Sequence, residues 1–131
     1  SQDLFDTMKA ASLLQKVHHR DAGVIKPYDV LRMATVGGAK ALGLDAHCGT
    51  IEVGKRADLI LVDMGTVHGA PVNDIFSQIV HCAKASDVCT VIVDGKVVMR
   101  DRQLTGLDDK KILADAKDAN RDLMNRLNSS L

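Results

Sequence analysis

Histidine and cysteine are the residue types in this chain best suited to hold a metal ion. The candidates are His18-His19, His47-Cys48, His81-Cys82 and Cys89. Adjacent residues of a helix point about a hundred degrees apart, so His18 and His19 cannot chelate one ion as an i,i+4 pair would. We interpret them as the polar end of a helix, where positive charge suits the negative end of the dipole. The other residues match no zinc-module spacing, and cysteine is commonly a small buried hydrophobe, so a converging zinc site is the less favoured alternative.

The nucleophiles and carboxylates form no catalytic constellation either. Cys48 and Ser12 have no evident partner base, which favours packing roles. Asp58 stands in an Ala-Asp-Leu context that favours a structural role, in which its side chain accepts backbone N–H bonds at the start of a strand. Gly37-Gly38 lacks the spacing and the preceding apolar strand of a phosphate loop, so a tight turn between helices is predicted. We therefore predict no catalytic residue and no metal ligand in this chain, and the sequence identifies no substrate-binding residue.

Composition excludes several other functions. The 131 residues suit one domain by size, and the 17 basic and 17 acidic side chains balance without a basic stripe, which disfavours nucleic-acid binding. Three cysteines without a C-x-x-C pair favour reduced thiols and a cytoplasmic location. No apolar run approaches transmembrane length, so no membrane partner is expected. Aromatic residues are few, and the core must be largely aliphatic.

The elements that position these residues begin with helices. Apolar residues recur at helical spacing over residues 3–19, with Ser1 or Asp3 as the N-cap. Pro27 is expected to open a second helix, and Gly43 to end a short third one. The expected inner faces are Leu4, Met8, Ala11, Leu13, Leu14 and Val17, then Val30, Leu31 and Ala34, then Ala39, Ala41 and Leu42.

From Gly49 onward the pattern changes to strands. Residues 51–53 predict a short strand, and the continuous apolar run at residues 59–62 predicts a strand covered on both faces. Asn73 is expected to cap a helix that carries Ile75, Phe76, Ile79 and Val80. Asp94-Gly95-Lys96, between the β-branched runs 88–93 and 97–99, predicts a hairpin because both turn residues favour positive φ.

A long helix is predicted after Asp108, which is its expected cap. Its apolar face consists of Ile112, Ala116, Ala119, Leu123 and Leu127. The charges between Lys110 and Arg126 are typical of a solvated helix face rather than of a recognition surface.

Two motifs resemble one family of enzymes. Residues 49–62 read G-x-I-x-x-G-x-x-A-D-L-I-L-V, and residues 3–16 read D-L-F-x-x-M-K-x-A-x-L-L-Q-K. The first is similar to the segment with which metal-dependent amidohydrolases re-enter their small β-domain after the catalytic barrel. The second resembles the branch of S-adenosylhomocysteine/methylthioadenosine deaminases, guanine deaminases and triazine hydrolases. Residues 30–35, 38–44, 74–81 and 91–98 resemble the same branch in the same order.

The resemblance implies a fold. The chain would be an α/β mixed fragment: the last helices of a TIM-like (β/α)8 barrel, the C-terminal share of the flanking small β-sandwich, and a C-terminal helix. Residues 1–48 would be the terminal helices of the barrel, residues 49–107 the strands and hairpin of the composite sandwich domain with one helix, and residues 108–131 a C-terminal amphipathic helix.

The resemblance also implies a chemistry. The parent would be a hydrolytic deaminase of adenosine-type or other purine or N-heterocyclic substrates, with a divalent metal that activates water; zinc is expected first and iron is the alternative. The family's His-x-His pair is absent from this sequence, and its aspartate ligand is expected upstream. The chain alone is therefore expected to be inactive and to bind no cofactor.

Two partners follow from this interpretation. One is the N-terminal barrel portion of the same protein. The other is a second copy of the fragment, because the first helix would leave its Leu/Met face exposed and such faces find partners. The alternative interpretation is a stand-alone, non-enzymatic association module.

Overall fold

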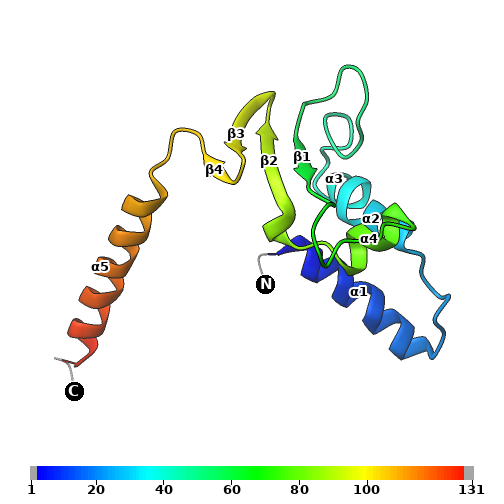
Figure 1. Cartoon of the computed structure of the whole chain (residues 1–131), viewed down its shortest axis with the longest axis horizontal. Helices are drawn as coiled ribbons and strands as arrows, with labels where there is room; N and C mark the ends of the chain where they lie inside the picture. Colours follow the sequence, from blue (N-terminus) through cyan, green and yellow to red (C-terminus); the bar gives the residue numbers. More distant parts are fainter. Residues whose placement is uncertain (1–2, 129–131) are drawn as a thin grey trace.

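The computed structural model describes residues 3–128, in which helices precede an antiparallel sheet, a short helix lies between the first and second strands in the sequence, and a last helix follows the sheet (Figure 1). In chain order the elements are α1 (Leu4–His19), α2 (Pro27–Arg32), the π-helical turn η1 (Met33–Gly37), α3 (Gly38–Ala41), β1 (Leu59–Val62), α4 (Ile75–His81), the 3-10 turn η2 (Ala85–Asp87), β2 (Val88–Val93), β3 (Lys96–Arg100), β4 (Gln103–Leu104) and α5 (Asp109–Asn128). No helix within residues 3–128 has both the length and the apolar character needed to cross a membrane.

The helix boundaries follow local signals. Asp3 accepts a hydrogen bond from the Phe5 N–H at 2.8 Å and caps α1, while Ser1 lies outside the described residues. Pro27 stands in the first turn of α2, as predicted. The short third helix ends beside Gly43, whose φ of 68° suits a glycine stop. The predicted cap of α4 was wrong by one residue, because Asp74, not Asn73, accepts the Ser77 N–H at 2.8 Å.

The predicted turn at Gly37-Gly38 is wrong. Both glycines have helical φ values, and the backbone runs from α2 through η1 into α3 without reversing. A π turn accommodates one extra residue within a helix, so the chain changes its helical register here without leaving the helix.

The sheet has the strand order β1-β2-β3-β4, and every pairing is antiparallel. The predicted hairpin joins β2 to β3 through Asp94 and Gly95, whose φ values are 49° and 77°. This turn is fastened to the segment before β1, since the Asp94 N–H donates to Asp58 Oδ1 at 2.7 Å and the Gly95 N–H donates to the Ala57 carbonyl at 3.1 Å. The structural role predicted for Asp58 is confirmed.

Two strand predictions did not hold. Residues 51–53 form no strand, and Ile51 and Val53 are almost fully exposed, because no strand within the described chain lies beside them to supply ladder hydrogen bonds. Leu59–Val62 is the strand β1, but Ile60 and Leu61 are about half exposed instead of covered.

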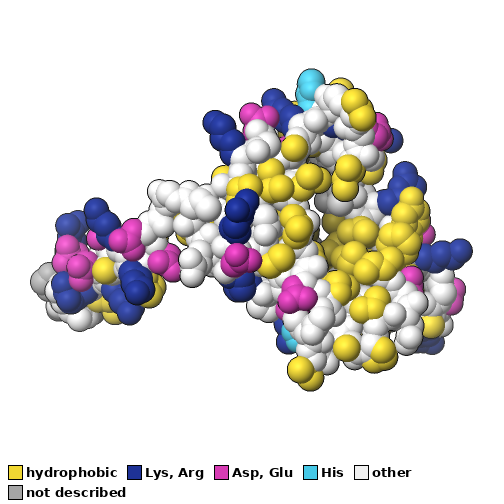
Figure 2. All heavy atoms as spheres, turned by 45° about the horizontal axis from the view of Figure 1, so that its top comes forward, with side chains coloured by type: hydrophobic (Ala, Val, Ile, Leu, Met, Phe, Trp, Pro, Cys, Tyr) yellow, Lys and Arg dark blue, Asp and Glu magenta, His cyan; other side chains and the backbone are white. Residues whose placement is uncertain are grey.

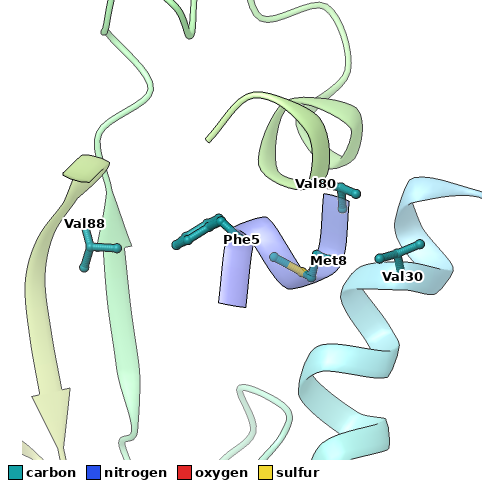
Figure 3. Close-up of a cluster of buried hydrophobic side chains, with 5 residues drawn as sticks. All are labelled: Phe5, Met8, Val30, Val80 and Val88. Carbon is teal, nitrogen blue, oxygen red and sulfur yellow. The ribbon is translucent and has the colours of Figure 1, made fainter. Parts of the chain in front are cut away.

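The core lies where α1, α2, α4 and the start of β2 meet (Figure 3). Figure 3 shows Phe5 pointing toward Val88 of β2, with Met8 near Val80 and Val30. The buried face of α1 is Phe5, Met8 and Ser12, whereas the predicted face members Leu4, Leu13, Leu14 and Val17 are exposed. The helix α1 therefore buries fewer residues than its apolar pattern predicts, and Leu4, Leu13 and Leu14 remain exposed.

The helix α5 stands apart from this body. All of its residues are exposed, and Figure 1 shows it projecting from the β4 end of the sheet. The Lys111 N–H donates to Asp108 Oδ1 at 3.0 Å, which confirms the predicted cap.

Candidate functional site

An apolar groove with a volume of about 690 Å³ lies between the helices and β1. Figure 2 shows hydrophobic side chains on both sides of a hollow in the body of the molecule. We call this surface the β1 groove; its lining includes Leu4, Met8, Leu31, Ala39, Leu42, Leu44, Cys48, Ile51, Ile60, Val62 and Ile79.

The few polar groups of the β1 groove do not form a reaction centre. Asp58 lines it, but its Oδ1 accepts the Asp94 backbone N–H. Cys48 also lines it, and its Sγ donates to the Leu44 carbonyl at 3.5 Å. Such a surface can pack against apolar groups of another segment or molecule.

The wall of the groove depends on a close backbone approach at Gly49, the first residue of the 49–62 motif. Gly49 has a φ of 94°, and a Cβ built on it would lie 2.8 Å from the Ala39 Cβ and 3.2 Å from the Val36 Cα. The Arg56 N–H donates to the His47 carbonyl at 2.8 Å and closes the loop that leads into β1. The glycine of the motif therefore brings this loop against α3.

A histidine–aspartate pair joins the loop after β1 to the start of β2. His68 Nε2 lies 2.8 Å from Asp87 Oδ2, and the Lys84 N–H donates to the same oxygen at 2.9 Å. Asp87 is 6% exposed. Burial, the largest influence, raises the pKa of this carboxyl, but the hydrogen bonds from His68 and from the Lys84 backbone, with the charge of His68, outweigh it and hold the pKa below its ordinary value.

The contact between His68 and Asp87 links two distant segments, and we call this pair the latch. Its geometry is not that of a catalytic relay. Thr66 Oγ1 lies 3.4 Å from the same His68 nitrogen that contacts Asp87. A nucleophile–histidine–carboxylate triad needs the hydroxyl and the carboxylate on opposite ring nitrogens. Sequence reasoning missed this pair, since its partners lie 19 positions apart and no motif links them.

The turn that carries Asp87 is tied to distant parts of the chain. The Ala85 N–H donates to Asp3 Oδ2 at 3.3 Å, which joins the N-terminus of α1 to this turn. Arg102 Nη1 donates to the carbonyls of Ala85, Ser86 and Val88. Hydrogen bonds thus connect the start of β2 and the turn before it to three other parts of the chain: His68, the N-terminus of α1 and the turn after β3.

The histidines and cysteines that the sequence singled out remain dispersed. The His18 and His19 rings contact each other edge to face at 4.8 Å, and Cys89 Sγ donates to the Leu61 carbonyl. His81 ends α4, and its pKa is lowered by burial and by the charges of Lys16 and Lys9. Within residues 3–128, no three His, Cys, Asp or Glu side chains are grouped so that they could hold a metal ion.

Ser12 is the remaining candidate nucleophile. It is completely buried, and its Oγ has no hydrogen-bond partner among the described residues. The packing role expected of it is confirmed, and its place is in the core.

Comparison with known proteins places these features in a family. Residues 1–98 match the model of the amidohydrolase family. A 5'-deoxyadenosine deaminase of Methanosarcina barkeri is 46% identical over 97% of this chain, which spans 29% of that relative. A 5-methylthioadenosine/S-adenosylhomocysteine deaminase of Pelotomaculum thermopropionicum is 45% identical over 95% of this chain, which spans 28% of it.

A solved structure agrees with these relatives. An adenosine deaminase from Xanthomonas campestris, described with bound zinc, superposes with a TM-score of 0.89 at 33% identity, over 92% of this chain and 28% of that one. This chain thus spans less than a third of the length of the relatives it matches.

Proposed function

Since this chain belongs to the amidohydrolase family, we propose that it is the C-terminal part of a metal-dependent hydrolase of non-peptide C–N bonds that deaminates adenosine-type substrates. The observation that carries the proposal is the similarity to deaminases along nearly the whole chain, at 46% identity over 97% of its residues. The same similarity favours an enzyme over the stand-alone association module, because the relatives named above are deaminases.

We propose that this part is scaffold. Residues 1–48 are assigned to the last helices of a (β/α)8 barrel, residues 49–107 to the C-terminal share of a flanking β-sandwich, and residues 108–131 to a C-terminal helix. The run of helices before the antiparallel sheet supports the first boundary. The helix α4 belongs to the sandwich segment, but it packs on α1 and α2 of the barrel segment. These contacts hold the two segments together.

We assign the metal to residues outside this chain. The described side chains do not fit a metal centre, because the His18 and His19 rings contact each other edge to face and the Cys48 and Cys89 thiols donate to backbone carbonyls. Zinc is the proposed ion, supported by its presence in the Xanthomonas campestris structure, with iron as the alternative. The role proposed for this chain is to support the part of the longer protein that forms the reaction centre. The longer protein is proposed to be a cytoplasmic enzyme that acts on small-molecule substrates.

The test compares this chain with the longer protein that contains it. The longer protein should release ammonia from 5'-deoxyadenosine, methylthioadenosine or S-adenosylhomocysteine, whereas the chain alone should show no turnover and no stoichiometric zinc by metal analysis. Turnover by the chain alone would overturn the assignment of the chemistry to residues outside it. A metal-loaded longer protein that deaminates none of these nucleosides would overturn the proposed activity.

A further inference from the structure

One carboxylate at the start of α1 joins two parts of the chain that lie far apart in the sequence. Asp3 Oδ1 accepts the Phe5 N–H at 2.8 Å and caps the helix, while Asp3 Oδ2 accepts the Ala85 N–H at 3.3 Å, 82 positions further along. The Asp3 carbonyl also accepts the Thr7 N–H at 3.1 Å and the Thr7 hydroxyl at 2.9 Å. Asp3 therefore orients the first turn of α1 and fastens it to the turn η2.

The turn η2, to which Asp3 is bonded, is itself well anchored. Arg102 Nη1 donates to the Ala85 carbonyl at 3.4 Å and to the Val88 carbonyl at 3.3 Å, and the latch holds the last residue of the turn. The neighbouring side chain of Phe5 is buried and points toward Val88 (Figure 3). The start of α1 is therefore tied to a fixed part of the sandwich segment by one buried ring and one carboxylate.

The proposed function gives this connection a consequence for catalysis. Residues 1–48 are assigned to the last helices of a (β/α)8 barrel, and such barrels carry their active-site groups on the loops that lead from each strand into the following helix. The N-terminus of α1 is then the end of one of these loops. A displacement of reacting groups by about 1 Å can cost roughly a hundredfold in rate, so the position of this helix end matters to the reaction.

We propose that Asp3 is a positioning residue for the reaction centre of the longer protein. By binding the Ala85 N–H while it caps α1, its carboxylate fixes the loop that leads into this helix against the sandwich segment. The inference rests on the proposed function, because it takes α1 to be a barrel helix of a longer amidohydrolase. Asp3 acts through the loop, and it is not proposed to contact the substrate.

Asp3→Asn and Asp3→Ser in the longer protein test this role. Asparagine and serine are both good N-caps, but neither side chain offers the two acceptor oxygens that Asp3 uses. Each variant should keep the cap and lose the bond to Ala85. We expect kcat for deamination of an adenosine derivative to fall about tenfold, with KM within about twofold of the wild-type value, because alignment of the reacting groups suffers more than binding.

Asp108→Asn is the matched control. Asp108 caps α5 by accepting the Lys111 N–H at 3.0 Å, so the same substitution is made at another helix cap. It should leave kcat unchanged. A wild-type kcat in both Asp3 variants would overturn the positioning role, and so would an equal loss of kcat in Asp108→Asn.

Hydrogen–deuterium exchange separates this inference from the proposed activity. In Asp3→Asn, the amides of the loop that precedes α1 in the longer protein should exchange faster than in the wild type, whether or not the protein deaminates a nucleoside. If no nucleoside is deaminated but the loop exchanges faster, the proposed activity fails and the positioning of the loop stands. If the loop exchanges at the wild-type rate, the positioning role is overturned, even where deamination is observed.

Discussion

Two carboxylates, Asp58 and Asp87, hold this chain together at points where distant segments meet. Asp58 accepts the backbone N–H of Asp94 in the hairpin turn, and Asp87 accepts His68 and the Lys84 N–H. At the scale of single residues, these two carboxylates therefore serve the architecture of the chain.

Breaking the latch between His68 and Asp87 should destabilise the fold. Asp87→Asn removes the negative charge to which His68 and the Lys84 N–H are hydrogen-bonded, and we expect a loss of about 1.5–3 kcal/mol in the free energy of unfolding, the usual range for hydrogen bonds to a charged group. Urea unfolding measures this. His68→Gln should show a smaller loss, because the Lys84 N–H bond remains. Equal stability of Asp87→Asn and the wild type would contradict the latch.

The contribution of the latch to the stability of the fold should depend on pH. The pKa of Asp87 is lowered in the folded state from its ordinary value of 3.8, so its contribution to stability is fully present above that value. The contribution is lost as the pH falls through the lowered folded-state pKa. Acid unfolding of Asp87→Asn should therefore lack this component and show a flatter dependence of stability on pH below about 4.

His81 should make stability depend on pH in a higher range. Its pKa is lowered by burial and by Lys16 and Lys9, so the unfolded chain binds a proton before the folded chain does as the pH falls below 6.5. The free energy of unfolding should then decrease from pH 7 to pH 5. In His81→Gln that decrease should be smaller, as measured by urea titrations at the two pH values. His18→Gln, at an exposed position, is the matched control, and an unchanged slope in His81→Gln would refute the expectation.

At the scale of elements, the loop before β1 is positioned by glycines with positive φ. Gly49 and Gly54 have nearly the same φ, 94° and 93°, but only Gly49 is crowded, by Ala39 and Val36. The two positions differ in packing and agree in backbone conformation. They therefore allow the two contributions to be separated.

Substituting alanine at each glycine should separate strain from packing. Gly54→Ala should cost about 1–2 kcal/mol, the usual cost of a side chain at positive φ. Gly49→Ala should cost a further roughly 1–3 kcal/mol, because its Cβ would overlap Ala39. Thermal or urea unfolding of both variants tests this. Equal losses at the two positions would mean that the loop moves away from α3 without cost.

At the scale of the whole molecule, apolar surface is left open in three places. Within residues 3–128, three apolar surfaces are uncovered: the β1 groove, the outer leucines of α1, and the side chains of Ile112, Leu113, Leu123, Met124 and Leu127 on α5. Exposed apolar surfaces of this extent usually mark interfaces. A scaffold that braces the rest of a longer enzyme would leave such surfaces when considered by itself.

The outer face of α1 should make this chain self-associate when it is alone. Leu14 and Val17 are 67% and 74% exposed, beside the partly exposed Leu4 and Leu13. Sedimentation of the isolated chain should show species larger than a monomer at high concentration, and Leu14→Asp with Val17→Asp should shift them toward the monomer. Lys9→Asp, a charge change at an exposed residue of the same helix, should not. A monomer at all concentrations would contradict this expectation.

The sequence by itself determined what depends on a few neighbouring residues. The caps at Asp3 and Asp108, the stop at Gly43 and the turn at Asp94-Gly95 were predictable because local backbone preferences set them. The family, too, could be identified from two motifs, since each is read within one segment. The same locality explains why Asp58 could be assigned a structural role.

Only the tertiary structure decided which surfaces meet. It paired His68 with Asp87, buried Phe5 and Ser12 of α1 in place of its outer leucines, and left residues 51–53 without a strand partner. These outcomes depend on which segments lie side by side, and no pattern within a segment records its neighbours. Burial and strand pairing are properties of contacts between distant residues, so they are decided when the chain folds.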